Sequence, residues 1–174
     1  MLVSALELEN GEVISLENGQ TIGAIRKPVI DPKNGKVLGF DIRIGFLTNR
    51  AILPLSEIID WTHLSLVVRD KNSLYEPQKK KKIFNFVKKR VKVIGLRAET
   101  ENGTKLGRVT DVFIDSISGI IAKYVIGHNI LFSFVEEGLI LSSSNVIRIE
   151  KKKIIFKDSA LKLIKSKTTE EATA

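Results

Sequence analysis

The sequence predicts a mainly β protein made of two small β-barrels in tandem, joined by an amphipathic helix. Three observations predict this class. A segment of about 70 residues occurs twice, its short apolar runs alternate with turn residues, and a lysine-rich stretch with helical periodicity separates the copies. The expected bounds are residues 1–76 for the first barrel, 77–90 for the helical linker, 91–164 for the second barrel and 165–174 for a disordered tail.

The internal repeat becomes visible when the sequence is shifted by 84 residues. Residues 17–42 then align without a gap on residues 101–126, with 8 identities in 26 positions. After four additional residues in the second copy the offset becomes 88, and residues 66–70 align on 154–158. Glycines, turn residues and apolar runs stay in one register, which indicates two copies of one structural unit.

Each copy is expected to form about five short strands with tight turns between them. The first-copy strands are predicted at 12–16, 21–29, 37–45, 51–54 and 65–69, and residues 56–59 and 144–147 are predicted to form a single helical turn or a bend before the last strand. Asn-Gly pairs and the repeated Asp31 and Asp115 favour turns, because these residues tolerate or stabilise turn backbone conformations. Glycines inside strand patterns favour bulges that curl a short sheet. The predicted turn glycines are Gly19, Gly35, Gly103 and Gly119, and the predicted bulge glycines are Gly23 and Gly107.

These motifs resemble the PRC-barrel family. The residues that carry the resemblance are Glu17-Asn18-Gly19 through Gly23-Ala24-Ile25, their counterparts Glu101-Asn102-Gly103 through Gly107-Arg108-Val109, and the Ile-Asp turns that follow at Ile30 and Ile114. The family includes the cytoplasmic domain of the photosynthetic reaction-centre H subunit and the C-terminal domain of a ribosome maturation factor. The arrangement is similar to bacterial tandem PRC-barrel proteins. The resemblance implies a barrel that stabilises or helps to assemble larger complexes. The copies depart from one another where Lys27-Pro28 stands opposite Asp111-Val112.

The connector between the copies carries the net positive charge of the chain. Residues 71–92 contain nine basic residues and one acid, whereas the remaining residues contain nineteen of each sign. On a helical wheel the apolar residues gather on one face and the lysines on the other, so a basic amphipathic helix is expected, continuing directly into a strand at 91–98. The candidate anion- or partner-binding residues are Lys79, Lys80, Lys81, Lys82, Lys88, Lys89 and Arg90, and the candidate apolar contacts are Phe84 and Phe86.

Three hypotheses remain open for this helix. Its apolar face packs on a barrel while the lysines stay in water; or the lysines bind phosphate of RNA or of anionic lipid; or the phenylalanines fill a groove of a partner protein. The longer hairpin at 127–138 offers Phe132 and Phe134, which either contact a partner or pack over a barrel mouth or against the linker.

Several classes of chemistry are not expected. The chain has no cysteine and two histidines, which excludes thiol catalysis and a histidine relay, and the serine and glycine patterns match no nucleophile or phosphate-loop motif. We therefore predict no catalytic residue, no metal and no cofactor. No segment approaches the about 18 to 20 apolar residues of a membrane span.

The predicted function is a non-enzymatic adaptor or scaffold that acts through protein–protein contact. The first alternative is a ribosome- or RNA-associated assembly factor that uses the basic helix, and the second is a peripheral membrane-associated protein. The predicted location is the cytoplasm, with attachment to the membrane surface under the second alternative. The sequence leaves the oligomeric state open.

Overall fold

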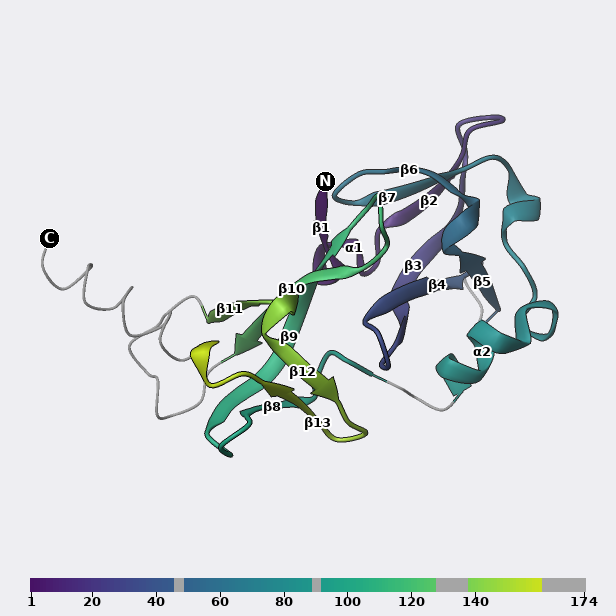
Figure 1. Cartoon of the computed structure of the whole chain (residues 1–174). Helices are drawn as coiled ribbons and strands as arrows, with labels where there is room; N and C mark the ends of the chain where they lie inside the picture. Colours follow the sequence, from purple (N-terminus) through teal and green to yellow (C-terminus); the bar gives the residue numbers. More distant parts are fainter. Residues whose placement is uncertain (46–48, 89–91, 128–137, 161–174) are drawn as a thin grey trace, which may run out of the picture. The chain divides into compact units, whose positions relative to one another are not determined.

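A computed structural model describes residues 1–45, 49–88, 92–127 and 138–160, and in these residues the protein is mainly β (Figure 1). The predicted fold class is confirmed at this level. The strands are β1 (Leu2–Ser4), β2 (Glu12–Ser15), β3 (Thr21–Asp31), β4 (Lys36–Arg43), β5 (Arg50–Pro54), β6 (Ile58–Trp61), β7 (Ser65–Val68), β8 (Arg97–Thr100), β9 (Lys105–Asp115), β10 (Ile121–Gly127), β11 (Leu139–Ser142), β12 (Val146–Ile149) and β13 (Lys153–Phe156). The helices are α1 (Ala5–Leu8) and α2 (Lys81–Lys88), with short 3₁₀ turns η1 (Leu55–Glu57), η2 (Lys71–Ser73), η3 (Pro77–Lys80) and η5 (Ser143–Asn145).

The chain divides into two compact units. Unit 1 comprises Met1–Lys92 together with Phe113–Ile121, and unit 2 comprises Val93–Val112 and the described residues from Ala122 onward. The connector helix α2 therefore belongs to unit 1. So does β1, whose antiparallel partner is the Phe113–Asp115 end of β9.

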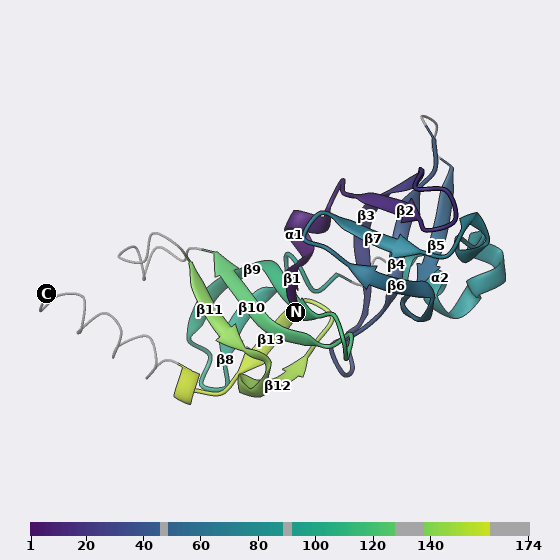
Figure 2. The same cartoon turned by 90° about the horizontal axis from the view of Figure 1, so that it is seen from above.

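The main sheet of unit 1 has the strand order β5-β4-β3-β2-β7-β6, which the two views in Figures 1 and 2 show from the front and from above. Its neighbouring strands are antiparallel except β2 and β7, which are parallel. Phe40 and Trp61 meet edge to face inside this unit, with ring centroids 5.4 Å apart. Within the described residues no ladder joins the outer strands β5 and β6, so the sheet is not closed into a barrel by hydrogen bonds.

The sheet of unit 2 repeats this plan. Its order is β11-β10-β9-β8-β13-β12, and its parallel pair is β8 with β13. The bounds of β3 and β9 differ by 84 residues, and those of β6 and β12 differ by 88, which are the two offsets found in the sequence. Tyr124, the counterpart of Phe40, is buried and meets Phe156 edge to face at 5.8 Å. The same sequence pattern thus produces the same strand order twice.

Repeat-related glycines lie at irregularities in both sheets. The register between β2 and β3 shifts opposite Gly23, and the register between β8 and β9 shifts opposite Gly107. Gly107 has a φ of 136°, and a Cβ atom there would overlap the carbonyl oxygen of Gly127. A Cβ atom at Gly23 would lie 2.6 Å from a methyl group of buried Ile42 and 3.2 Å from the carbonyl oxygen of Arg43, but the φ of Gly23 is not positive. The backbone at Gly107 in the second copy therefore requires glycine more strictly than the backbone at Gly23 in the first copy does.

Two details differ from the sequence-based prediction. The helical turn expected at 56–59 is present as the 3₁₀ turn at Leu55–Glu57, but a sixth strand that was not predicted, β6, follows it, and the second copy repeats this with η5 and β12. The connector does not continue directly into a strand either, because a turn at Val93–Gly95 precedes β8, and Gly95 has a φ of 93° that a helix or strand does not allow. The expected disordered tail at 165–174 lies outside the described residues.

Candidate functional site

The apolar side of α2 packs against the sheet of unit 1. Val87 is buried in one cluster with Val29 of β3 and Ile52 of β5, and Ile83 and Phe84 pack against this cluster half-buried. The helix is seen beside β4 and β5 in Figure 2. Phe84, a candidate partner contact, is thus engaged within the fold. The hypothesis that the apolar face of the connector packs on its own domain agrees with these contacts.

The lysines of the connector are presented on the outside of this docked segment. Lys79, Lys81 and Lys82 are exposed, and Lys80 is half-buried with its Nζ atom 3.9 Å from the centre of the Tyr75 ring. A cation above an aromatic face is held by the ring quadrupole, so this contact restrains Lys80. The remaining candidates, namely the side chains of Phe86 and Lys88 and the residues Lys89, Arg90, Phe132 and Phe134, lie outside the described residues.

Tyr75 joins the connector to the sheet. Its backbone exchanges two hydrogen bonds with Ile52 of β5, of 2.8 and 2.9 Å, so it extends the sheet at the β5 edge. Its hydroxyl donates to Glu57 Oε1 at 3.1 Å. That hydrogen bond to a carboxylate, followed by burial, raises the pKa of Tyr75 above its ordinary value.

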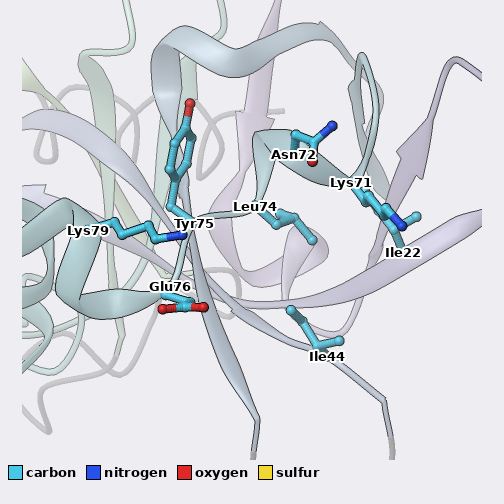
Figure 3. Close-up of a pocket in the computed structure, with 8 residues that line it drawn as sticks. All are labelled: Ile22, Ile44, Lys71, Asn72, Leu74, Tyr75, Glu76 and Lys79. Atoms are coloured by element: carbon cyan, nitrogen blue, oxygen red, sulfur yellow. The ribbon is translucent and has the colours of Figure 1, made fainter.

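A pocket of about 670 Å³ opens where the chain leaves the sheet of unit 1 (Figure 3). Leu74 and Ile44 point into it, while Lys79 and Tyr75 lie on one side and Lys71 on the other. Asp70 caps η2 by accepting a 2.6 Å hydrogen bond from the backbone of Asn72, and this turn places the Lys71 side of the pocket. The lining residues are Ile22, Ile44, Lys71, Asn72, Leu74, Tyr75, Glu76 and Lys79. The pocket therefore combines three aliphatic side chains with two lysines and one carboxylate.

A second group of cations lies on β3 and β5 of the same unit, around a carboxylate on β4. The register between β3 and β4 shifts between Ile25 and Lys27, and this irregularity leaves Arg26 and Lys27 beside Asp41. Asp41 is fully buried and accepts two hydrogen bonds from Arg50, from Nε at 3.0 Å and from Nη2 at 2.6 Å. The Nε atom of Arg26 is 3.9 Å from the same carboxylate. We call Arg26, Lys27 and Arg50 the cationic cluster.

The charges in this cluster are not balanced. Three cations share one carboxylate, and Lys92 is close enough to act on Lys27 electrostatically. Burial is the main cause that lowers the pKa of Lys27, Asp41 opposes it, and Lys92, Arg50 and Arg26 lower it further. The surroundings of Lys27 in the folded protein therefore disfavour the charged form of its side chain.

The sequence did not reveal the cationic cluster, because the basic and acidic residues outside the connector are equal in number. Their net charge is therefore zero and gives no sign of a local excess of cations. The available signal was the difference between the two copies. At the repeat-equivalent positions the second copy has Thr110, Asp111 and Gly138 in place of the three cations, and Val125 in place of Asp41. The cluster is therefore a property of the first copy alone.

The predicted turn residues occupy turns. Asp31 accepts a hydrogen bond from the backbone of Lys33 at 2.9 Å, and Asp115 accepts from the backbone and hydroxyl of Ser118 at 2.7 and 2.8 Å. These bonds lower the pKa of Asp115 below its ordinary value. The turn glycines with φ between 66° and 83° are Gly19, Gly35, Gly103 and Gly119.

The described residues contain neither a group of metal-ligand side chains nor a helix that could span a membrane. Among residues 1–45, 49–88, 92–127 and 138–160, no three histidine, cysteine or acidic side chains are grouped as metal ligands would be. The same residues contain no helix with the length and apolar character needed to cross a bilayer.

Comparison with known families assigns one part of the chain. The family model described as the PRC-barrel domain matches residues 87–163. The match covers less than half of the chain. It confirms the resemblance noted in the sequence for the second copy, while the cationic cluster and the pocket lie in the first copy, outside the matched range. A search of curated proteins found no match to the chain.

Proposed function

We propose that this protein is a non-enzymatic adaptor or scaffold, built from two tandem PRC-barrel-like units, that acts by binding a partner protein. The tandem arrangement is supported by the identical strand order of the two sheets, including the position of the parallel pair. The family match at residues 87–163 supports a PRC-barrel-like second unit. Because folds are shared among many functions, the binding role has to be argued from a site.

The observation that carries the proposal is the pocket beside the connector. Its aliphatic residues Ile22, Ile44 and Leu74 suit an apolar side chain, and Lys71 and Lys79 leave a net positive rim after Glu76 is counted. A pocket of about 670 Å³ falls in the size range of sites for small ligands and short peptide segments. We propose that it receives an acidic segment of a partner protein that inserts one apolar residue, since this occupant matches both the lining and the charge.

The proposal is tested by measuring capture and direct binding with the full-length chain. The chain is used to capture proteins from the native cell, and a protein recovered in a 1:1 ratio with the chain is purified. The affinity of this protein is then measured for the wild type and for Ile44→Ser combined with Lys71→Gln. We expect at least about tenfold weaker binding, equivalent to about 1.4 kcal/mol. The matched control is Ile140→Ser combined with Lys152→Gln in unit 2, where Ile140 is 55% exposed. Equal loss in both variants, or measurable turnover of a substrate, would contradict the proposal.

A second function is favoured by the outward-facing lysines. Since Val87, Ile83 and Phe84 are occupied by the packing of α2 on unit 1, the exposed lysines sit on a folded surface. Positive charge fixed on a rigid surface suits the regular phosphates of a nucleic acid. The second candidate is therefore an RNA-associated assembly factor. Peripheral membrane attachment is the third candidate, and the packing of Val87, Ile83 and Phe84 on unit 1 makes these three side chains less available for insertion into a bilayer.

A further inference from the structure

We propose that the cationic cluster of unit 1, Arg26, Lys27 and Arg50, binds the phosphodiester backbone of a nucleic acid. This inference rests on the RNA-associated function above and adds a defined site to it, on strands β3 and β5 and separate from the lysines of the connector.

Arg50 is held in the orientation that phosphate recognition requires. A guanidinium has five N–H donors, and Asp41 engages two of them, on Nε and Nη2. Three donors remain, one on Nη2 and two on Nη1, and one from each of these nitrogens together form a fork that matches two phosphate oxygens. The Arg50 side chain is 34% exposed, so solvent reaches it although its partner carboxylate is fully buried. The buried Asp41 thus fixes the arginine before any ligand arrives.

The cluster carries more positive charge than its surroundings neutralise. Asp41 offsets one of the three cations, and Arg26 is 49% exposed with its nearest carboxylate oxygen 3.9 Å away. An arriving phosphate would contribute the negative charge that the cluster lacks. The lowered pKa of Lys27 is consistent with this, because the crowding of cations by Lys92, Arg50 and Arg26 would be relieved by an anion.

The fold does not require these charges. The second copy forms a sheet of the same strand order with Thr110, Asp111 and Gly138 at the equivalent positions. A buried carboxylate that holds an arginine is rarely a gain in stability over apolar packing. The presence of Asp41 and its cations in one copy alone therefore points to a role in binding.

A nucleic acid fits this site better than a membrane. Lys27 and Arg50 are half-buried, so a narrow chain of phosphates reaches them more readily than a flat layer of headgroups does. Fixed guanidinium groups also suit phosphate oxygens more specifically than a surface potential does. The lysines of α2 provide further positive charge on the same unit, which a polyanion can follow beyond the cluster.

The test measures binding of the full-length chain to a fluorescently labelled oligouridine and to a DNA of equal length, as a function of salt. The test variant is Arg26→Gln combined with Lys27→Gln, which keeps Arg50 and so does not leave Asp41 buried without a partner. For single strands each phosphate contact contributes about 0.7 to the slope of log K against log salt, so two lost contacts reduce the slope by about 1.4. At about 100 mM salt this corresponds to about 25-fold weaker binding.

Three further variants separate the explanations. Lys151→Gln with Lys152→Gln removes the same charge from two exposed residues of unit 2 and is expected to change affinity less than about threefold. Lys81→Gln with Lys82→Gln tests the connector alone. Arg50→Lys keeps the charge and removes the fork, and we expect weaker binding with an almost unchanged salt slope. Trp61 fluorescence and circular dichroism verify that each variant is folded.

Each outcome decides the proposal. If the cluster variant loses affinity for nucleic acid and the unit 2 control does not, the result supports the site. Comparison of oligouridine with the DNA then shows which backbone the site prefers. If the wild type binds neither nucleic acid, both the site and the RNA-associated function are wrong. If only the connector variant loses affinity, the function stands and the site is wrong. If polyglutamate displaces the labelled oligouridine as effectively as unlabelled oligouridine does, the ligand is an acidic protein instead of a nucleic acid. If the protein binds phosphatidylserine vesicles through the cluster and binds no nucleic acid, the ligand is a membrane.

Discussion

Truncating Val87 tests whether the connector helix is docked on unit 1. Val87 is 7% exposed and shares a cluster with Val29 and Ile52, whereas Asn85 of the same helix is exposed. If the helix were a free linker, Val87→Ala would change the stability of the domain very little. Because the helix is packed, the substitution removes two methyl groups from a buried contact.

The magnitude follows from that burial. Two methyl groups correspond to about 1.6 kcal/mol of lost transfer free energy, and the cavity that remains adds a further contribution, so we expect a loss of about 2 kcal/mol. Domains of this size are stable by about 5 to 15 kcal/mol, so the change is large. With an m-value of about 2 kcal/mol/M, the urea midpoint falls by about 1 M.

The assay uses the single tryptophan of the chain. Trp61 is 9% exposed and packs edge to face on Phe40, so its emission reports the unfolding of unit 1. Urea titrations of Val87→Ala and of the control Asn85→Ala give the two midpoints. Equal midpoints for these variants would refute the docking of the helix, and with it the argument that its lysines are displayed on a rigid surface.

Three further predictions concern glycine, lysine and tyrosine positions. Gly107→Ala lowers the thermal midpoint more than Gly23→Ala, because its added Cβ meets backbone and its φ is 136°; equal effects in a thermal melt would contradict this. Lys27→Met raises the stability at pH 7, because the folded state lowers the Lys27 pKa and so disfavours its charge; the gain shrinks as pH rises through that lowered value toward 10.5, and a destabilised variant at pH 7 would disprove it. Burial raises the pKa of Tyr124 to about 12, so stability falls as pH rises from 10 toward 12; ultraviolet titration should show its tyrosinate only near pH 12, and Tyr124→Phe should reduce that fall.

The duplication was readable from the sequence because its strands and turns use local signals. Apolar alternation and Asn-Gly turns placed β3 and β9, and the offset of 84 residues predicted their equivalence. The sixth strand was missed because Ile58–Trp61 is short and follows a 3₁₀ turn, so its residues show no alternation long enough to detect. Only its pairing with β7 makes it a strand.

The candidate site was predictable only in part, because its two components depend on different kinds of information. Contiguous lysines at 79–82 are visible in any charge tally. The cationic cluster is assembled from β3 and β5 around a carboxylate on β4, and such grouping requires the strand register. The shift between Ile25 and Lys27, which leaves Arg26 and Lys27 beside Asp41, has no signature in the sequence alone.

The central claim is that binding takes place on the first copy, while the second copy repeats its strand order without the cationic cluster. The most direct measurement is a backbone amide NMR titration of the full-length chain with oligouridine. We expect chemical-shift changes around Arg26, Asp41 and Arg50 and in the exposed part of the connector. Changes centred instead on Thr110 and Val125, the equivalent positions of the second copy, would contradict the claim.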